Sequence, residues 1–362
     1  MYLLTRLLRD NEINGEINGQ CMLIMRGRVV IGLSFFFMGG FIMMLIVKNY
    51  RTLQTVQDTR VLTSDDTSGG KNVLKPVCKV DFTNVYSMDL TTWSTNNKVC
   101  SECQNFIKAT LKTPYGNTPI FVYPAAQDPW VSGILISSGH FEAEKSSIMF
   151  DLLKSDPELN LIDIGANIGV YTLSAAKMGR KVLAVEALDR NVRHICASVA
   201  GGGLQDKVTL VHNAISNSNG VVNLGVDKNN MGGTFVDVDS DHIKKLKEGR
   251  AQGTYGTVHT IKMDDLLKIP GIKNFKKVVV KMDIEGFEAK AMEGASLFFE
   301  KIKIVGFIME WEFHRKQKTA DTILKFMSKH NFIPHSLSSA KQKLDYTKSE
   351  SWGYDVLWLP KG

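Results

Sequence analysis

The segment 161–171, with the sequence LIDIGANIGVY, constrains the fold more than any other part of the chain. It begins with a short apolar run that contains one acid, Asp163, as in a buried strand of a parallel sheet. Gly165 and Gly169 then predict a tight turn, and residues 168–178 predict a helix. A strand, a glycine turn and a helix in this order present backbone N–H groups and a helix N-terminus to a ligand.

The spacing of the glycines indicates which ligand this turn can hold. A dinucleotide-binding turn needs G-x-G-x-x-G, whereas this turn has only Gly165 and Gly169. A carboxylate at Asp163, just before the turn, is poorly placed for a pyrophosphate but suits a cationic amino group. Glu186 ends the next predicted strand (181–187), about 20 residues further on, where an acid binds ribose hydroxyls. This pattern is typical of a pocket for S-adenosylmethionine, which has an amino acid end and an adenosine but no phosphate.

An apolar segment lies near the amino end. Residues 29–47 carry no charge, and basic residues flank them on both sides. A helix needs about 20 apolar residues to cross the hydrocarbon core of a bilayer. We therefore predict a single transmembrane helix at 29–47 that follows a short tail (1–28) and acts as a signal anchor. A cleaved signal peptide fits less well, because the apolar run is long and no small-residue cleavage site follows it.

The charges beside this helix do not decide its orientation, because both sides are basic. A short tail before a single span is typical of signal anchors, which would place the rest of the chain in the lumen of the Golgi or the endoplasmic reticulum. Residues 48–118 begin as a polar, flexible stem and continue as a lead-in, and residues 119–362 form the main predicted domain.

Composition and cysteines exclude some classes of protein. The net charge is +7, but the basic residues are spread along the chain rather than interleaved with aromatic residues, which argues against nucleic acid as a partner. Cys100-x-x-Cys103 lacks the second ligand pair of a zinc site. In an oxidising lumen, Cys78, Cys100 and Cys103 would supply one disulfide whose pairing stays open, whereas Cys196, on a predicted helix, is interpreted as a buried thiol.

The rest of the chain alternates predicted strands and helices. Before the glycine turn we expect a strand at 119–124 and helices at 130–137 and 142–154. After it we expect a helix at 189–199, strands at 208–215, 278–282 and 304–309, helices at 287–299 and 319–330, and final strands at 333–337 and 354–359. Residues 221–263 predict a strand-rich insertion with a polar helix at 241–248. The alternation predicts a mostly parallel sheet with helices on both faces, and one of the last two strands should be antiparallel because no helix separates them.

Acidic residues gather at or near the carboxyl ends of these strands. They are Asp163, Glu186, Asp283, Glu285, Glu310 and Glu312. Open α/β sheets bind their ligands at that edge, so this clustering indicates an enzyme. Asp283 and Glu310 are also a possible oxygen-ligand site for Mg²⁺ or Ca²⁺, and Lys281 is alternatively one half of a structural ion pair.

Two further positions are candidates because of where they lie. Residues 139–142 precede the helix that leads into the first strand, and such a segment often covers the ligand, which makes His140 and Glu142 candidates. Asn213, near the end of the third strand, is placed to meet the edge of an adenine ring. A histidine on a strand, such as His212, is more often packed or exposed than catalytic.

Three motifs resemble the FkbM family of S-adenosylmethionine-dependent methyltransferases: DIGANIGVY at 163–171, VEA at 185–187 and KMDIEGFE at 281–288. The resemblance covers about residues 119–360. It implies an α/β fold, the Rossmann-like class I methyltransferase fold, with a seven-stranded, mostly parallel sheet and helices on both faces, here preceded by the transmembrane helix. It also implies methyl transfer to a hydroxyl, often of a sugar or a natural product.

We therefore expect a membrane-anchored O-methyltransferase for a glycan or a related small acceptor. The candidate cofactor-binding residues are Glu142, Asp163, Gly165, Ala166, Asn167, Gly169, Tyr171, Glu186, Asn213 and Asp283. The candidate bases are Asp283, Glu285, His140 and His314. The alternative is a catalytically inactive FkbM-like membrane protein that acts as a trafficking or interaction factor in the secretory pathway.

Overall fold

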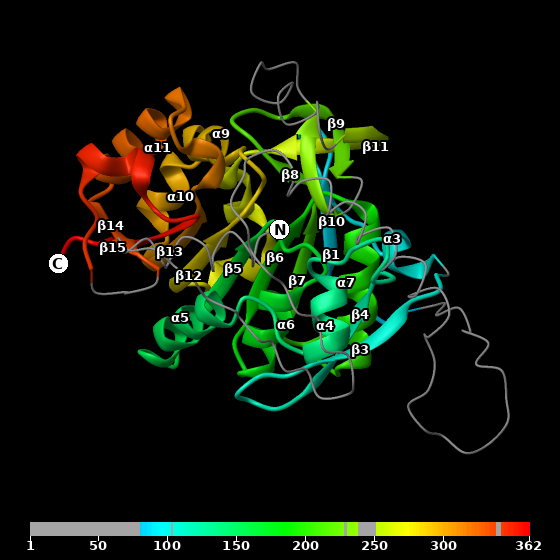
Figure 1. The fold of residues 1–362 in the computed structure, drawn as a ribbon. Helices are drawn as coiled ribbons and strands as arrows, with labels where there is room; N and C mark the ends of the chain where they lie inside the picture. Colours follow the sequence, from blue (N-terminus) through cyan, green and yellow to red (C-terminus); the bar gives the residue numbers. More distant parts are fainter. Residues whose placement is uncertain (1–79, 103, 228–229, 238–250, 338–341) are drawn as a thin grey trace, which may run out of the picture. The chain divides into compact units, whose positions relative to one another are not determined.

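The computed structural model describes residues 80–102, 104–227, 230–237, 251–337 and 342–362 (Figure 1). The predicted transmembrane helix at 29–47 and the predicted polar helix at 241–248 lie outside the described residues. Within the described ranges, no helix has both the length and the apolar character needed to cross a membrane.

A nine-stranded sheet lies at the centre of the domain. Its strands are β1 (Val85–Met88), β2 (Trp93–Thr95), β5 (Asn160–Ile164), β6 (Val182–Glu186), β7 (Val208–His212), β12 (Lys277–Met282), β13 (Lys303–Glu310), β14 (Phe332–Ser336) and β15 (Asp355–Pro360). They lie in the order β14-β15-β13-β12-β5-β6-β7-β1-β2. β5, β6, β7, β12 and β13 run parallel, and β15 is antiparallel to both β13 and β14. The predicted mostly parallel, Rossmann-like sheet is confirmed.

Helices cover both faces of this sheet (Figure 1). One face carries α5 (Ala143–Lys154), α6 (Val170–Lys177) and α7 (Asp189–Gly201). The other carries the 3₁₀ helices η1 (Met263–Lys268) and η2 (Pro270–Asn274), together with α9 (Glu288–Glu293), α10 (Ser296–Lys301) and α11 (Lys318–Lys329). Alternation along the strands explains the two layers: Leu161 of β5 packs into the first, and its neighbour Ile162 into the second.

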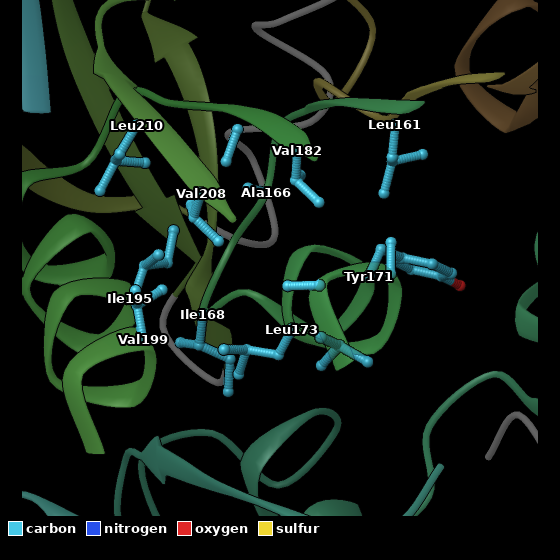
Figure 2. Packing of buried hydrophobic residues seen from close by; sticks show 14 of the residues in the cluster. Leu161, Ala166, Ile168, Tyr171, Leu173, Val182, Ile195, Val199, Val208 and Leu210 are labelled. Atoms are coloured by element: carbon cyan, nitrogen blue, oxygen red, sulfur yellow. The ribbon is translucent and has the colours of Figure 1, made fainter. Parts of the chain in front are cut away.

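Branched aliphatic side chains fill the first layer, as Figure 2 shows. Leu161, Val182 and Val208, from three adjacent strands, lie with Leu173 of α6 and Ile195 of α7 in one buried cluster. Full burial of one such side chain contributes about 1.5–3 kcal/mol relative to exposure. This packing fixes β5 and α6, and it therefore fixes the glycine turn that joins them.

The sheet has two strands more than the predicted seven. β1 pairs in parallel with β7, and β2 pairs antiparallel with β1. Asn84 reinforces this edge, because its Nδ2 donates to the carbonyl oxygen of Val208 at 2.8 Å. The predicted strand at 119–124 corresponds to β4 (Thr118–Val122), but it pairs with β3 (Ile107–Leu111) in a separate two-stranded sheet. The helix α4 (Ser132–Ser138) follows β4.

Two predicted elements are divided in the structure. The predicted strand at 208–215 breaks at Asn213 into β7 and β8 (Ala214–Ile215). β8 joins the predicted insertion, a four-stranded sheet with β9 (Gly220–Asp227), β10 (Asn230–Asp237) and β11 (Ala251–Ile261), in the order β10-β9-β11-β8. The predicted helix at 287–299 is the pair α9 and α10, which Gly294 separates. A Cβ on Gly294 would lie 2.6 Å from the carbonyl oxygen of Ser216, so the chain passes too closely there for a larger residue.

A disulfide joins Cys196 of α7 to Cys100 of the short helix α3 (Lys98–Ser101). The prediction of a buried thiol at Cys196 is therefore wrong. Both cysteines are buried, and 96 residues separate them in the sequence, so no local pattern marks the pair. Cys78 and Cys103, the other predicted candidates for a disulfide, lie outside the described residues.

Candidate active site

One face of the sheet changes from apolar to charged at the edge formed by the carboxyl ends of its parallel strands. In the core, this face carries Leu161, Val279, Ile308 and Leu357. Two residues closer to the edge on the same strands, it carries Asp163, Lys281, Glu310 and Asp355. Residues two apart on a strand share a face, so all four ionisable side chains lie on the face that α5 and α6 cover. Lys281 lies opposite Asp163, and Asp355 lies opposite Glu310.

The glycine turn packs directly against the end of β12. Gly165 has a φ of +75°, and a Cβ there would lie 1.9 Å from the carbonyl oxygen of Asp283. The N–H of Asp283 donates to the carbonyl oxygen of Ile164 at 3.1 Å, and Lys281 Nζ donates to that of Gly165 at 2.8 Å. Only glycine combines this backbone conformation with such a close approach. The structure thus brings together the two segments that the sequence predicts as cofactor-binding.

Asp163 lies beneath the turn and is completely buried. Its Oδ2 accepts a hydrogen bond from the Thr172 hydroxyl at 2.6 Å. Its Oδ1 has no hydrogen-bond partner among the described residues and lies 3.7 Å from Lys281 Nζ. Burial raises the pKa of Asp163, and Lys281 opposes that rise. This environment suits a carboxylate that holds Lys281 and the turn in place better than one that contacts a ligand directly.

Glu186 points from the end of β6 to the glycine turn. Its Oε2 accepts from the N–H of Asn167 at 2.7 Å, and its Oε1 accepts from the N–H of Leu188 at 2.9 Å and from Asn191 Nδ2 at 3.3 Å. A carboxylate accepts about four hydrogen bonds, so capacity remains for a hydroxyl donor. Burial raises the pKa of Glu186 to about 7, although these donors favour the ionised form.

Asp283 is the accessible acid beside the turn, with 26% of its side chain exposed. It lies between two lysines, with its Oδ2 3.7 Å from Lys281 Nζ and 3.8 Å from Lys145 Nζ. Burial acts to raise the pKa of Asp283, but the two lysines and a hydrogen bond with Glu310 bring it below its usual value. Burial and the charge of Asp283 raise the pKa of Glu310 well above its usual value, so Glu310 is the protonated donor of that bond. Asp283 therefore carries a fixed negative charge.

Lys145, in the first turn of α5, connects three acids at this edge. Its Nζ lies 2.8 Å from Asp355 Oδ1, 3.1 Å from Glu142 Oε1 and 3.8 Å from Asp283 Oδ2. Burial acts to lower the pKa of Lys145, but the three acids raise it above its usual value, so the side chain stays an ammonium. The sequence does not mark Lys145 and Asp355 as site residues. It shows that Lys145 follows Glu142 by three positions, but it does not show that Lys145 and Asp355 meet in the folded chain.

Glu142 connects this cluster to the helix that follows the glycine turn. Its Oε2 accepts a hydrogen bond from the Tyr171 hydroxyl at 2.5 Å, and the Tyr171 ring lies 5.4 Å from Lys281 Nζ. The predicted covering segment therefore reaches the cluster through Glu142. The His140 side chain is exposed, and in the part of the chain that the structure describes it forms no bond with the cluster.

Asn213, which the sequence predicts to meet an adenine edge, has a structural role in the fold. It is buried at the break between β7 and β8. Its Oδ1 accepts from the N–H of Met88 at 2.8 Å, and its Nδ2 donates to the carbonyl oxygens of Met88 at 2.7 Å and His259 at 3.0 Å. These bonds use both N–H groups of the amide and join β1 to the sheet, and the contact with adenine stays a prediction.

His314 is not available as a base. It is buried in the 3₁₀ helix η3 (Glu312–His314), and its two ring nitrogens bond to Glu288 Oε2 at 2.8 Å and Thr319 Oγ1 at 2.9 Å. The other oxygen of Glu288 accepts from the N–H of Ile284 at 2.8 Å. This chain of bonds holds the loop after β12, which includes Glu285 at a φ of +56°. Across the described ranges, no group of three or more His, Cys, Asp or Glu side chains is arranged to hold a metal ion.

Comparison with known families identifies the same segments. A family model described as "Methyltransferase FkbM domain" matches residues 163–334. The matched range begins at Asp163 and includes Glu186, Lys281, Asp283 and Glu310. No curated protein matches the chain.

Similar solved structures include three methyltransferases. A SAM-dependent methyltransferase from Agrobacterium tumefaciens is 9% identical, with a TM-score of 0.35, over 74% of this chain and 76% of that chain. An O-methyltransferase from Bacillus cereus in complex with SAH is 10% identical, with a TM-score of 0.30, over 61% and 82%. The precorrin-6y C5,15-methyltransferase from Geobacter metallireducens GS-15 is 10% identical, with a TM-score of 0.30, over 60% and 87%.

Proposed function

The chain carries a methyltransferase domain of the FkbM family, and on this premise we propose that it transfers the methyl group of S-adenosylmethionine to a hydroxyl of a glycan or a related small acceptor. The observation that carries the proposal is the position of Asp283. It is an ionised, accessible carboxylate, packed backbone to backbone against the glycine turn at Gly165.

The residues present fit this cofactor. A cationic amino group needs an ionised, accessible carboxylate, which Asp283 supplies. A ribose needs a hydrogen-bond acceptor at the end of the next strand, which Glu186 supplies. When bound, S-adenosylmethionine would supply an activated methyl group on a sulfonium.

The chain's own residues would bind and orient the reactants. Asp283 lies at the end of β12 and Glu186 at the end of β6, with β5 between these strands. A ligand held at both points extends along the sheet edge from β12 to β6. The adjoining edge over β13 and β15 is left for the acceptor. Alignment of the acceptor oxygen with the methyl carbon supplies much of the rate enhancement in such a displacement.

We also propose that the domain lies in the lumen of the endoplasmic reticulum or the Golgi, anchored by the apolar segment 29–47. The Cys100–Cys196 disulfide supports this location, because disulfides form and persist in oxidising compartments. The apolar segment itself has the composition of a membrane span.

The test of the proposed function is methyl transfer by the purified full chain. S-adenosylmethionine tritiated in the methyl group would be incubated with a panel of methyl glycosides and released glycans. Tritium should appear in an acceptor with the wild type and with the exposed control Asp151→Asn, and be lost with Asp283→Asn. Transfer by Asp283→Asn at the wild-type rate would contradict the proposal.

A further inference from the structure

We propose that Asp355 is the base that accepts the proton of the acceptor hydroxyl, and that Lys145 is the residue that positions it. The inference rests on the proposed function and adds the acceptor side of the same site. It starts from the row of acids that crosses the ends of three adjacent strands.

Asp355 lies at the part of the sheet edge, over β13 and β15, that we propose for the methyl acceptor. It begins β15 and lies opposite Glu310 of β13, while Asp283 follows β12 on the other side of Glu310. The strand order β15-β13-β12-β5-β6 puts Asp355 beyond Asp283 as seen from Glu186. Lys145 Nζ lies 2.8 Å from Asp355 Oδ1 and 3.8 Å from Asp283 Oδ2, so one ammonium group spans the distance between the two acids.

The neighbouring acids, Asp283, Glu310 and Glu142, are less suited to accept the proton because of their own interactions. Asp283 lies between two lysines and is held as a fixed negative charge. Burial and the charge of Asp283 raise the pKa of Glu310 well above its usual value, which favours the neutral acid and makes Glu310 a poor proton acceptor. Glu142 accepts a hydrogen bond from the Tyr171 hydroxyl at 2.5 Å and contacts Lys145 through its other oxygen. Asp355, with 17% of its side chain exposed, contacts Lys145 through Oδ1.

The charges around Asp355 give it the basicity that this role needs. Lys145 faces it from α5 and Glu142 from the residue before α5, Tyr171 from α6, Asp283 from the end of β12 and Glu310 from β13. Burial raises the pKa of Asp355 to about 6; Lys145 opposes the rise, and Asp283 and Glu142 add to it. A carboxyl group of this kind is mostly ionised at neutral pH and still a stronger base than an ordinary aspartate.

The step balances without a further reactant. The acceptor oxygen forms a bond to the methyl carbon, and its proton passes to the Asp355 carboxylate. The electron pair of the broken carbon–sulfur bond stays on sulfur, so the sulfonium becomes a neutral thioether. Lys145 keeps its contacts with Glu142 and Asp283 after Asp355 is neutralised, so it stays in place during the step.

The experiment measures two properties of the full chain: the affinity for S-adenosylhomocysteine by calorimetry, and the rate of methyl transfer to methyl glycosides against pH. Asp355→Asn should lower kcat by about 100-fold or more, the usual contribution of a positioned base, and leave the affinity unchanged. The acid limb of the wild-type rate profile should have its midpoint at about 6. Asp355→Glu should restore part of the rate.

Lys145→Met separates a positioning role from a structural one. Loss of the ammonium should move the acid limb upward by about one pH unit or more, whereas Lys154→Met, on the exposed side of the same helix, should not move it. Carboxyl-carbon NMR of protein labelled at aspartate, assigned by comparison with Asp355→Asn, should show the same midpoint without any turnover. If Asp355→Asn kept both the wild-type rate and the acid limb, the inference would be overturned. If the wild type did not bind S-adenosylhomocysteine, the proposed function would be overturned instead.

Discussion

Gly165 and Asp283 contact each other backbone to backbone, so closely that a Cβ on Gly165 would lie 1.9 Å from the carbonyl oxygen of Asp283. These residues are more than a hundred positions apart in the sequence, yet they begin the two turns that border the site. The contact sets the distance between the glycine turn and Asp283, the acid that we assign to the amino group of the cofactor.

Gly165→Ala should disrupt this contact and unfold the site. Gly179 offers a matched control, because it also has a positive φ, +88°, but nothing lies within 4 Å of its Cβ position. Gly179→Ala should cost only backbone strain, about 1–2 kcal/mol. Gly165→Ala should cost clearly more, because main-chain atoms of the loop after β12 must move as well. Equal losses of unfolding free energy in urea denaturation would show that the contact is not tight.

Glu186 should make both stability and binding depend on pH. Its pKa is about 7 in the folded chain and 4.5 in the reference state. The folded state therefore holds more protons between these values, and the unfolding free energy should fall as pH rises through that window, by roughly 3 kcal/mol for this group. Binding of S-adenosylhomocysteine should strengthen as pH rises through 7, because ribose hydroxyls donate best to the ionised carboxylate.

Glu186→Gln tests both effects at once. The pKa values of Asp163, Glu310 and Asp355 are also raised, so these acids contribute slopes of the same sign, and the informative quantity is the difference between wild type and variant. The variant should lose the part of the pH slope that Glu186 contributes, and it should bind S-adenosylhomocysteine weakly at every pH. Glu144→Gln, at an exposed position on α5, should change neither quantity. An identical slope in wild type and Glu186→Gln would mean that Glu186 titrates normally.

The disulfide should be found between Cys100 and Cys196 and should stabilise the domain. Peptide mapping by mass spectrometry without reduction would identify the linked pair. The bond closes a loop of 96 residues, and a loop of about that length contributes roughly 4–5 kcal/mol in the chain-entropy account. Reduction, or the double change Cys100→Ala with Cys196→Ala, should lower the unfolding free energy by about this amount and lower the melting temperature with it. A link between Cys100 and Cys103 would contradict the structure.

Asn213→Ala should damage the fold and spare the cofactor site. The change leaves the buried N–H of Met88 and two carbonyl oxygens without their partner. Each unsatisfied buried group costs about 1–3 kcal/mol. Affinity for S-adenosylhomocysteine, measured well below the melting temperature, should stay at the wild-type level. A selective loss of affinity without loss of stability would restore the contact with adenine that the sequence predicts.

The strongly periodic parts of the chain were predictable from the sequence. The strand at Asp163, the glycine turn and the strand at Glu186 follow from short apolar runs and turn residues, which are local signals. β1 and β2 were not predictable as part of the sheet, because they are short and half polar and gain their place only by pairing with β7. The sequence does not indicate the break at Asn213 either, since the apolar pattern continues through it.

The site also contains residues that the sequence indicates and residues that only the fold brings together. Glycines and acids at strand ends mark the cofactor side, because their spacing is fixed by one strand–turn–helix unit. Lys145 and Asp355 belong to elements more than two hundred residues apart and meet only through the order of the strands. His314 looked like a candidate base in the sequence, but its two nitrogens are bonded within the fold.

The most direct test of the central claim is a calorimetric titration of S-adenosylhomocysteine into the full chain, beside Asp283→Asn and the exposed control Asp151→Asn. We expect saturable one-to-one binding by the wild type and the control, and a large loss of affinity in Asp283→Asn with an unchanged melting temperature. No binding by a folded wild type, or equal binding by Asp283→Asn, would contradict the assignment of this edge of the sheet as the cofactor site.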